Sequence, residues 1–124
     1  MSENVKTSWE QKVINLNHEL EKAELELIME KLNASTTADD IVGDNDKEYR
    51  YSKLMRTPRV TAYINDEPTE VCINEVKARR NEKGEISVML TAYLANDPTE
   101  EEFDLCSNQV ALGHLYFVAN CIRQ

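Results

Sequence analysis

Alternation of apolar and polar residues is clearest in the segment 86–94 and predicts a β-strand there. Its apolar members recur at every second position and are Ile86, Val88, Leu90, Ala92 and Leu94. A period of two places such residues on one face of a sheet. The segment 60–64 and the segment 71–80, which contains several β-branched residues, are two further candidate strands.

The sequence NEKG at residues 81–84 fits a turn that joins the last two of these strands, with Gly84 in the left-handed conformation. The register that this turn sets pairs Arg80 with Ile86, Ala78 with Val88, Val76 with Leu90 and Cys72 with Leu94. Cys72, Val76 and Ala78 then share a face with the apolar residues of the partner strand. This agreement favours an antiparallel hairpin.

An internal repeat keeps an alternative open. Residues 60–70 read VTAYINDEPTE and residues 90–100 read LTAYLANDPTE, so six of eleven positions are identical. In the second copy Asp97 and Pro98 fit the start of a helix. If the first copy behaves in the same way, a helix over residues 68–81 gives a parallel β-α-β-α arrangement from residue 59. With the hairpin, both PTE turns instead lie at the same end of an antiparallel sheet.

A first helix is predicted over residues 8–33. Ser8 and Gln11 form a capping box at its start. Apolar residues then recur at spacings of four and three, and they are Trp9, Val13, Leu16, Leu20, Ala23 and Leu27. Near the end of the helix the apolar face is wider, because it also contains Leu25, Ile28, Met29 and Leu32. This stripe fits packing on the domain's own core and also fits pairing with a helix of another molecule.

A second helix is predicted over residues 103–122, because the chain has no Asp, Glu, Lys or Arg between Leu105 and Ile122. On a helical wheel one apolar face contains Phe103, Cys106, Val110, His114, Phe117 and Cys121. The other apolar face contains Leu112, Leu115, Ala119 and Ile122. A helix that is apolar on most sides is buried, and its polar residues argue against a membrane span.

Together these patterns predict one α+β domain over residues 1–124. It consists of a long N-terminal helix, a polar loop with a basic segment over residues 34–57, and a three-stranded antiparallel meander. The C-terminal helix packs on this sheet.

Charge and cysteine content narrow the possible partners. The net charge is −9, from 23 acidic and 14 basic residues, which disfavours nucleic acid and anionic membranes. One short segment, residues 47–59, interleaves tyrosines with basic residues as nucleic-acid sites do, but its other interpretation is a solvated surface.

The odd number of cysteines and the lack of a CxxC pair argue against disulfides and zinc. With no apolar leader segment, we expect a cytoplasmic location.

We find no nucleophile signature, phosphate loop or zinc motif, so the sequence predicts no catalytic residue and no cofactor. The acidic end of the sheet is a weak candidate for Mg²⁺ or Ca²⁺. Its carboxylates are Asp66, Glu67, Glu70, Asp97, Glu100 and Glu101. Turn formation and helix capping explain the same residues equally well.

The sequence therefore predicts a small acidic interaction or regulatory protein that acts by binding another protein. Two alternatives are an acidic inhibitor of a basic, nucleic-acid-binding surface and a metal-dependent enzyme that uses the acidic end of the sheet. The apolar second helix also predicts a homodimer. The expected contact residues are Trp9, Leu16, Leu112, Leu115, Tyr116 and Ala119.

Overall fold

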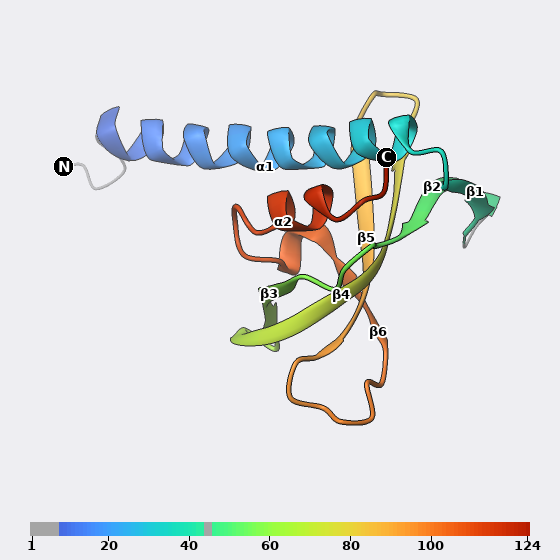
Figure 1. The fold of residues 1–124 in the computed structure, drawn as a ribbon. Helices are drawn as coiled ribbons and strands as arrows, with labels where there is room; N and C mark the ends of the chain where they lie inside the picture. Colours follow the sequence, from blue (N-terminus) through green and yellow to red (C-terminus); the bar gives the residue numbers. More distant parts are fainter. Residues whose placement is uncertain (1–7, 44–45) are drawn as a thin grey trace.

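The protein is an α+β domain in which two helices cover one face of an antiparallel sheet (Figure 1). The structure is a computed structural model that describes residues 8–43 and 46–124, with the side chains of the first helix described from Asn17 onward. The elements in chain order are α1 (Ser8–Ala34), β1 (Asp39–Val42), β2 (Glu48–Lys53), β3 (Arg59–Ile64), β4 (Glu67–Arg80), β5 (Ile86–Leu94), β6 (Phe103–Cys106), the 3₁₀ helix η2 (Ser107–Gln109) and α2 (Leu115–Asn120).

The sheet has six strands, of which the sequence predicted three. Its order is β1-β2-β4-β5-β6, and β3 pairs with β4 on the same edge as β2. The 14-residue strand β4 is long enough to hold both, with Lys53 opposite Glu75 and Arg59 opposite Cys72. Strands β1 and β2 lie in the segment predicted to be a polar loop, and β6 lies in the predicted C-terminal helix.

The predicted β4–β5 hairpin is confirmed, and the alternative helix over residues 68–81 is wrong. Three of the four predicted pairs are present: Arg80 with Ile86, Ala78 with Val88 and Val76 with Leu90. The fourth fails because a bulge at Asn74 adds one residue to β4. Leu94 therefore pairs with Val71, and Cys72 pairs with Tyr93 on the opposite face of the sheet.

The predicted continuous helix over residues 103–122 is wrong. Its first residues form β6, which pairs with β5 and turns Leu105 into the core. Val110 then makes a bridge with Ala62, and Gly113 has a φ of 91°, which a helix cannot contain. The missing charge reflects burial, but the chain achieves that burial with a strand, a turn and a six-residue helix.

The second predicted helix start, at Asp97, is also absent. The Asp97 carboxylate accepts hydrogen bonds from the backbone N–H groups of Thr99 and Glu101, as an N-cap would. Glu100 has a φ of 52°, so the backbone leaves the helical path after one turn. The Thr99 hydroxyl also donates a hydrogen bond to the Asp97 carboxylate, and this bond is the largest cause of the lowered pKa of Asp97. The hydrogen bonds from the two N–H groups lower this pKa further.

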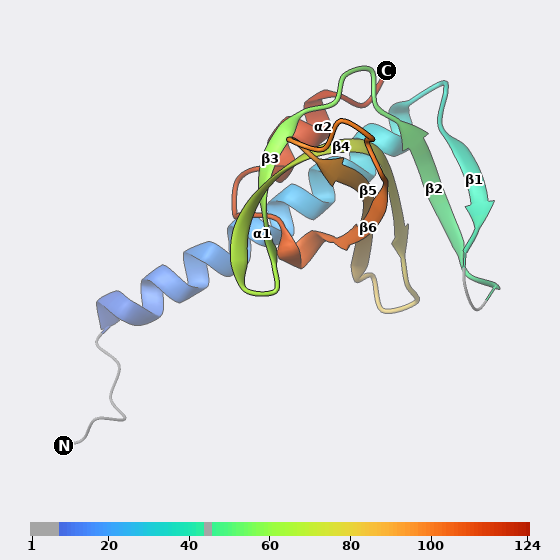
Figure 2. The same ribbon diagram turned by 90° about the horizontal axis from the view of Figure 1, so that it is seen from below.

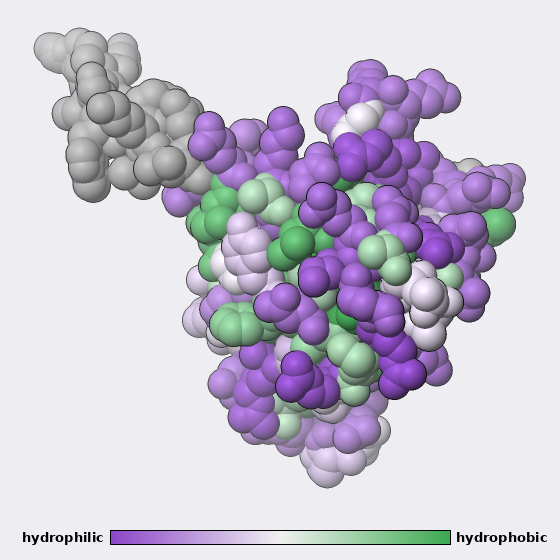
Figure 3. All heavy atoms as spheres, turned by 45° about the horizontal axis from the view of Figure 1, so that its top comes forward, coloured by the Kyte–Doolittle hydropathy of each residue, from purple (hydrophilic) through white to green (hydrophobic). Residues whose placement is uncertain are grey.

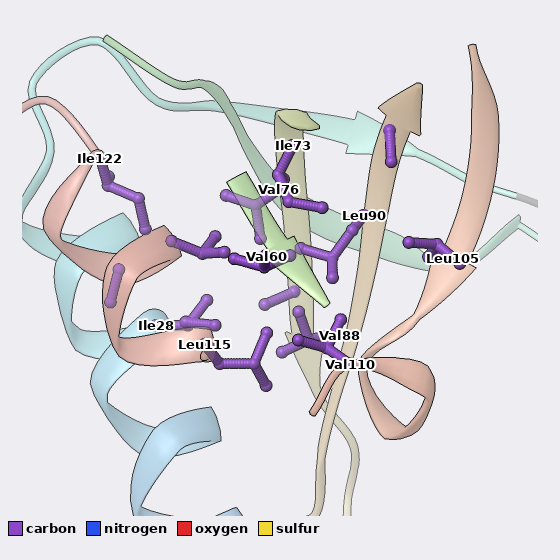
Figure 4. Packing of buried hydrophobic residues seen from close by; sticks show 14 of the residues in the cluster. Ile28, Val60, Ile73, Val76, Val88, Leu90, Leu105, Val110, Leu115 and Ile122 are labelled. Atoms are coloured by element: carbon purple, nitrogen blue, oxygen red, sulfur yellow. The ribbon is translucent and has the colours of Figure 1, made fainter. Parts of the chain in front are cut away.

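The core lies between the helices and the inward face of the sheet (Figure 4). Ile28 and Leu32 of α1 are fully buried against it. The sheet and the C-terminal segment contribute Val60, Ile73, Val76, Val88, Leu90, Leu105, Leu115, Val118 and Ile122. The face of α1 that packs here is the wider apolar face predicted near the end of the helix, and Leu25 and Leu27 pack against its border. The narrow stripe contributes less, because Ala23 is exposed and Leu20 is only half-buried.

One buried carboxylate joins the two helices. Glu24 of α1 is 2% exposed. Its Oε1 accepts a hydrogen bond from the Gly113 N–H at 2.9 Å, and its Oε2 accepts one from the Leu115 N–H at 2.8 Å. The first N–H groups of a helix have no partner within the helix, so this side chain satisfies donors at the start of α2.

Neighbouring residues of α2 provide a test of its orientation. Leu115 is buried, whereas Phe117, which the predicted helix would have buried, is 57% exposed. Leu115→Ala should lower the free energy of unfolding by about 2–5 kcal/mol, as core truncations do. Phe117→Ala should lower it by about 1 kcal/mol or less. Urea unfolding of both variants measures the difference, and equal losses would contradict this placement of α2.

Candidate functional site

The face of the sheet that points away from the helices is the candidate functional site. Viewed from below, the strands lie in front and α1 lies behind them; within residues 8–43 and 46–124, no helix lies over this side (Figure 2). We call it the open face, and its residues are Asp39, Ile41, Tyr49, Tyr51, Lys53, Glu75, Lys77, Arg79, Ser87, Met89, Thr91, Tyr93, Asp104 and Cys106. In β4, β5 and β6 they alternate with residues of the core.

Strand pairing arranges these side chains in rows across the sheet. One row contains Tyr51, Lys77, Met89 and Cys106. The next row contains Lys53, Glu75, Thr91 and Asp104. Residues in the same row come from strands far apart in the sequence, so only the sheet order brings them together.

Two cations surround Tyr49 at one end of the open face. The Lys77 Nζ lies 5.2 Å from the centre of the tyrosine ring, and the Arg79 guanidinium carbon lies 5.9 Å from it. In the part of the chain that the structure describes, the ion pairs are Arg50–Asp40, Arg59–Glu70 and Arg80–Glu26, so neither cation has a carboxylate partner there. The tyrosine ring stabilises the two charges in part.

The Arg79 Nε is buried and has no hydrogen-bond acceptor among the described residues. A buried donor without an acceptor costs about 1–3 kcal/mol. Arg79 therefore adds to the open face a positive charge that has no carboxylate partner among the described residues.

Acidic groups surround Tyr51, two residues further along β2. Burial, and then the Glu75 carboxylate, raise the pKa of Tyr51 to about 12, with Glu102 and Asp39 adding to the effect. A depression of about 120 Å³ beside it is lined by Ile41, Tyr51, Glu75, Val76, Lys77, Met89 and Thr91. The open face thus has a cationic end, a small depression with a mixed polar and apolar lining, and an acidic end.

The raised pKa of Tyr51 makes stability depend on pH in a defined direction. The folded chain holds the Tyr51 proton up to about pH 12, whereas the ordinary pKa of a tyrosine is 10.0. Below pH 10 this contribution to stability is fully present, and it is lost as the pH rises through about 12.

We therefore expect the wild type to lose more stability than Tyr51→Phe between about pH 9 and about pH 11, measured by urea unfolding. Tyr63→Phe is the control, because Tyr63 is 48% exposed, and it should behave as the wild type does. A Tyr51→Phe variant that loses as much stability as the wild type would contradict the assignment.

The two acidic segments predicted from the sequence lie at the same end of the sheet, where the Asp97 carboxylate accepts hydrogen bonds within its own turn. The Ala95 N–H donates to the Glu70 carbonyl, which brings the two PTE segments side by side. The side chain of Glu70 lies 3.6 Å from Arg59. Among the residues that the structure describes, no three His, Cys, Asp or Glu side chains are placed to hold a metal ion, and this includes Asp66, Glu67, Glu70, Asp97, Glu100 and Glu101.

The residues predicted for a dimer contact fall into three groups. Leu115 and Ala119 are buried in the chain's own core, so they are not available for an interface and that assignment is withdrawn. Leu112 is 39% exposed and Tyr116 is half-buried. The side chains of Trp9 and Leu16 lie outside the described residues.

The basic segment 47–59 does not form a continuous patch. Arg50 points to the helix side, where it donates to the Leu32 carbonyl and pairs with Asp40 at 3.3 Å. Arg59 pairs with Glu70, and only Lys53 belongs to the open face. Strand β2 was not predicted from the sequence, although the alternation of Tyr49 and Tyr51 with Arg50 and Ser52 is the pattern that could have predicted it.

No family model, curated protein or solved structure matches the chain. None of the helices within the described residues has the length and apolar character needed to span a membrane. Functional inference therefore rests on the geometry of the open face.

Proposed function

We propose that this chain is a protein-binding module that docks its partner on the open face and performs no catalysis. The carrying observation is the composition of a sheet face that no described helix covers. It contains three of the five tyrosines of the chain, together with Met89 and the unpaired Lys77 and Arg79. Tyrosine, methionine and arginine are enriched in the buried parts of protein interfaces.

The charge of the open face supports the same proposal. The chain as a whole has a net charge of −9. On the open face, however, Lys53, Lys77 and Arg79 balance Asp39, Glu75 and Asp104. By contrast, the surface around α1 is largely hydrophilic, with apolar residues only scattered over it (Figure 3). The open face is thus a surface that a partner meets without a net repulsion.

The two alternative functions predicted from the sequence gain no comparable support. An acidic inhibitor would use the acid-rich first helix together with the acidic edge of the sheet, and a metal-dependent enzyme would use the carboxylates at the end of the sheet. There Asp97 is engaged by Thr99 and Glu101, and Glu70 pairs with Arg59. We therefore retain protein binding as the proposed function.

Photo-crosslinking in the native host tests this function. A photoreactive residue at Met89, in the middle of the open face, should give protein adducts at least several-fold above those at two control positions. The controls are Glu30 on the outer side of α1 and Glu82 in the β4–β5 turn, both exposed. Equal adduct yields at all three positions would show that the open face is not the docking surface.

A further inference from the structure

We propose that the open face binds a second copy of this chain, so that two sheets stack face to face about a two-fold axis. The inference rests on the proposed function, because it names the partner of the same surface. Stacked sheets of this kind lie about 10 Å apart with their strands nearly aligned.

The order of charges along β4 carries the inference. Glu75 and Lys77 are successive outward residues of β4 and lie in adjacent rows of the open face. Two residues of a strand span about 7 Å. A two-fold axis that lies between the two sheets, and crosses over β4 between these two residues, makes the partner's β4 run in the opposite direction. Glu75 then faces Lys77 of the partner subunit, and Lys77 faces the partner's Glu75.

The same axis also determines what two other residues of the open face contact. It places Met89 opposite Thr91 of the partner subunit, since these residues lie in the same two rows. It also brings Arg79 toward the end of β5 that carries the partner's Tyr93. A tyrosine hydroxyl can accept a hydrogen bond from a guanidinium N–H group.

A second copy fits this face better than a strongly charged partner does. Two chains with a net charge of −9 repel one another over most of their surfaces. The balanced charge of the open face removes that penalty where the sheets meet. An acidic partner would gain from Lys77 and Arg79 but be repelled by Glu75 and Asp104, and a basic partner would meet the reverse problem.

Light scattering of the purified full chain at micromolar concentration is the first measurement. We expect a mass twice the 14.3 kDa of one chain. Lys77→Glu and Glu75→Lys should each weaken the dimer by about 10–100-fold in Kd, because each variant places like charges in both symmetric contacts. The matched controls Lys83→Glu and Glu82→Lys reverse charges in the exposed β4–β5 turn and should leave the mass unchanged.

Mixing provides the decisive step. An equimolar mixture of the Lys77→Glu chain and the Glu75→Lys chain places opposite charges in both contacts, so it should restore the dimer mass. A chain that carries both substitutions should also dimerise. Recovery on mixing cannot come from the folding of either chain alone. Met89→Arg, which adds two like charges beside the axis, gives an independent disruption if a charge reversal affects folding.

Three results would overturn the proposal: a wild-type mass of 14.3 kDa, a dimer that neither charge reversal weakens, or a mixture that stays monomeric. In each case, adducts of Met89 with other proteins would leave the proposed binding function intact. Failure of that function would instead appear as equal crosslinking at Met89, Glu30 and Glu82.

Discussion

Replacing Glu24 with alanine should lower the free energy of unfolding by about 3–5 kcal/mol. The carboxylate is buried and accepts hydrogen bonds from the N–H groups of Gly113 and Leu115. Removing it leaves two donors at the start of α2 without an acceptor and opens a cavity between α1 and the C-terminal segment. Urea unfolding followed by circular dichroism measures the loss.

Two further variants identify the cause of this loss. Glu24→Gln keeps the shape and one acceptor oxygen, so it should cost about half as much as Glu24→Ala. Glu21→Ala lies on the same helix, but its side chain is exposed, and it should change stability by about 0.5 kcal/mol or less. If Glu24→Ala matched Glu21→Ala, the contact between Glu24 and α2 would be disproved.

The same substitution should also loosen the attachment of the C-terminal segment to β3. The loop before α2 is held there by His114, whose Nδ1 accepts a hydrogen bond from the Thr61 N–H, and by the Ala111 N–H, which donates to the Thr61 carbonyl. Amide exchange at Leu115 should therefore accelerate in Glu24→Ala more than exchange at Val76 in the sheet centre.

The β4–β5 hairpin could be predicted from the sequence because two local signals agree. Alternation over residues 86–94 and the turn at residues 81–84 set the same register. That prediction holds from Arg80 to Val76 and ends at the bulge. Nothing in a period-two pattern marks Asn74 as an extra residue. Its backbone carbonyl accepts a hydrogen bond from the Leu54 N–H, which belongs to a part of the chain distant in sequence.

The C-terminal segment shows the limit of helical periodicity. Its lack of charge correctly indicated burial, since Leu105, Val110 and Leu115 are all in the core. A segment rich in apolar residues fits a helical wheel whatever its structure. Its first residues form a strand because they pair with the edge of β5 that is not occupied by β4.

The open face could not be predicted, because its rows depend on strand order. Tyr51, Lys77 and Met89 are separated by many residues in the sequence and become neighbours only when β2, β4 and β5 pair. The tyrosines also lie in a segment whose many charged residues suggested a loop. A strand near the edge of an antiparallel sheet often has charged residues on its solvated side. In β2 these charges obscure the alternation of apolar and polar residues that would mark a strand.

The side of α1 that faces the core is the wider apolar face predicted near the end of the helix rather than the narrow stripe. The stripe with spacings of four and three runs through Leu20, Ala23 and Leu27. The buried residues are Glu24, Ile28, Met29 and Leu32; Glu24 adjoins Leu20 of the stripe, and the other three lie further around the helix.

Leu32→Ala should therefore lower the free energy of unfolding by about 2–5 kcal/mol, because Leu32 is fully buried between α1 and the sheet. Leu20→Ala removes the same atoms from a half-buried side chain and should cost about 1 kcal/mol or less. Both substitutions exchange leucine for alanine within one helix, so helix propensity contributes equally to each. Urea unfolding of the two variants gives the comparison directly. A larger loss for Leu20→Ala would mean that the predicted stripe packs on the core, and that α1 is rotated about its axis relative to the structure.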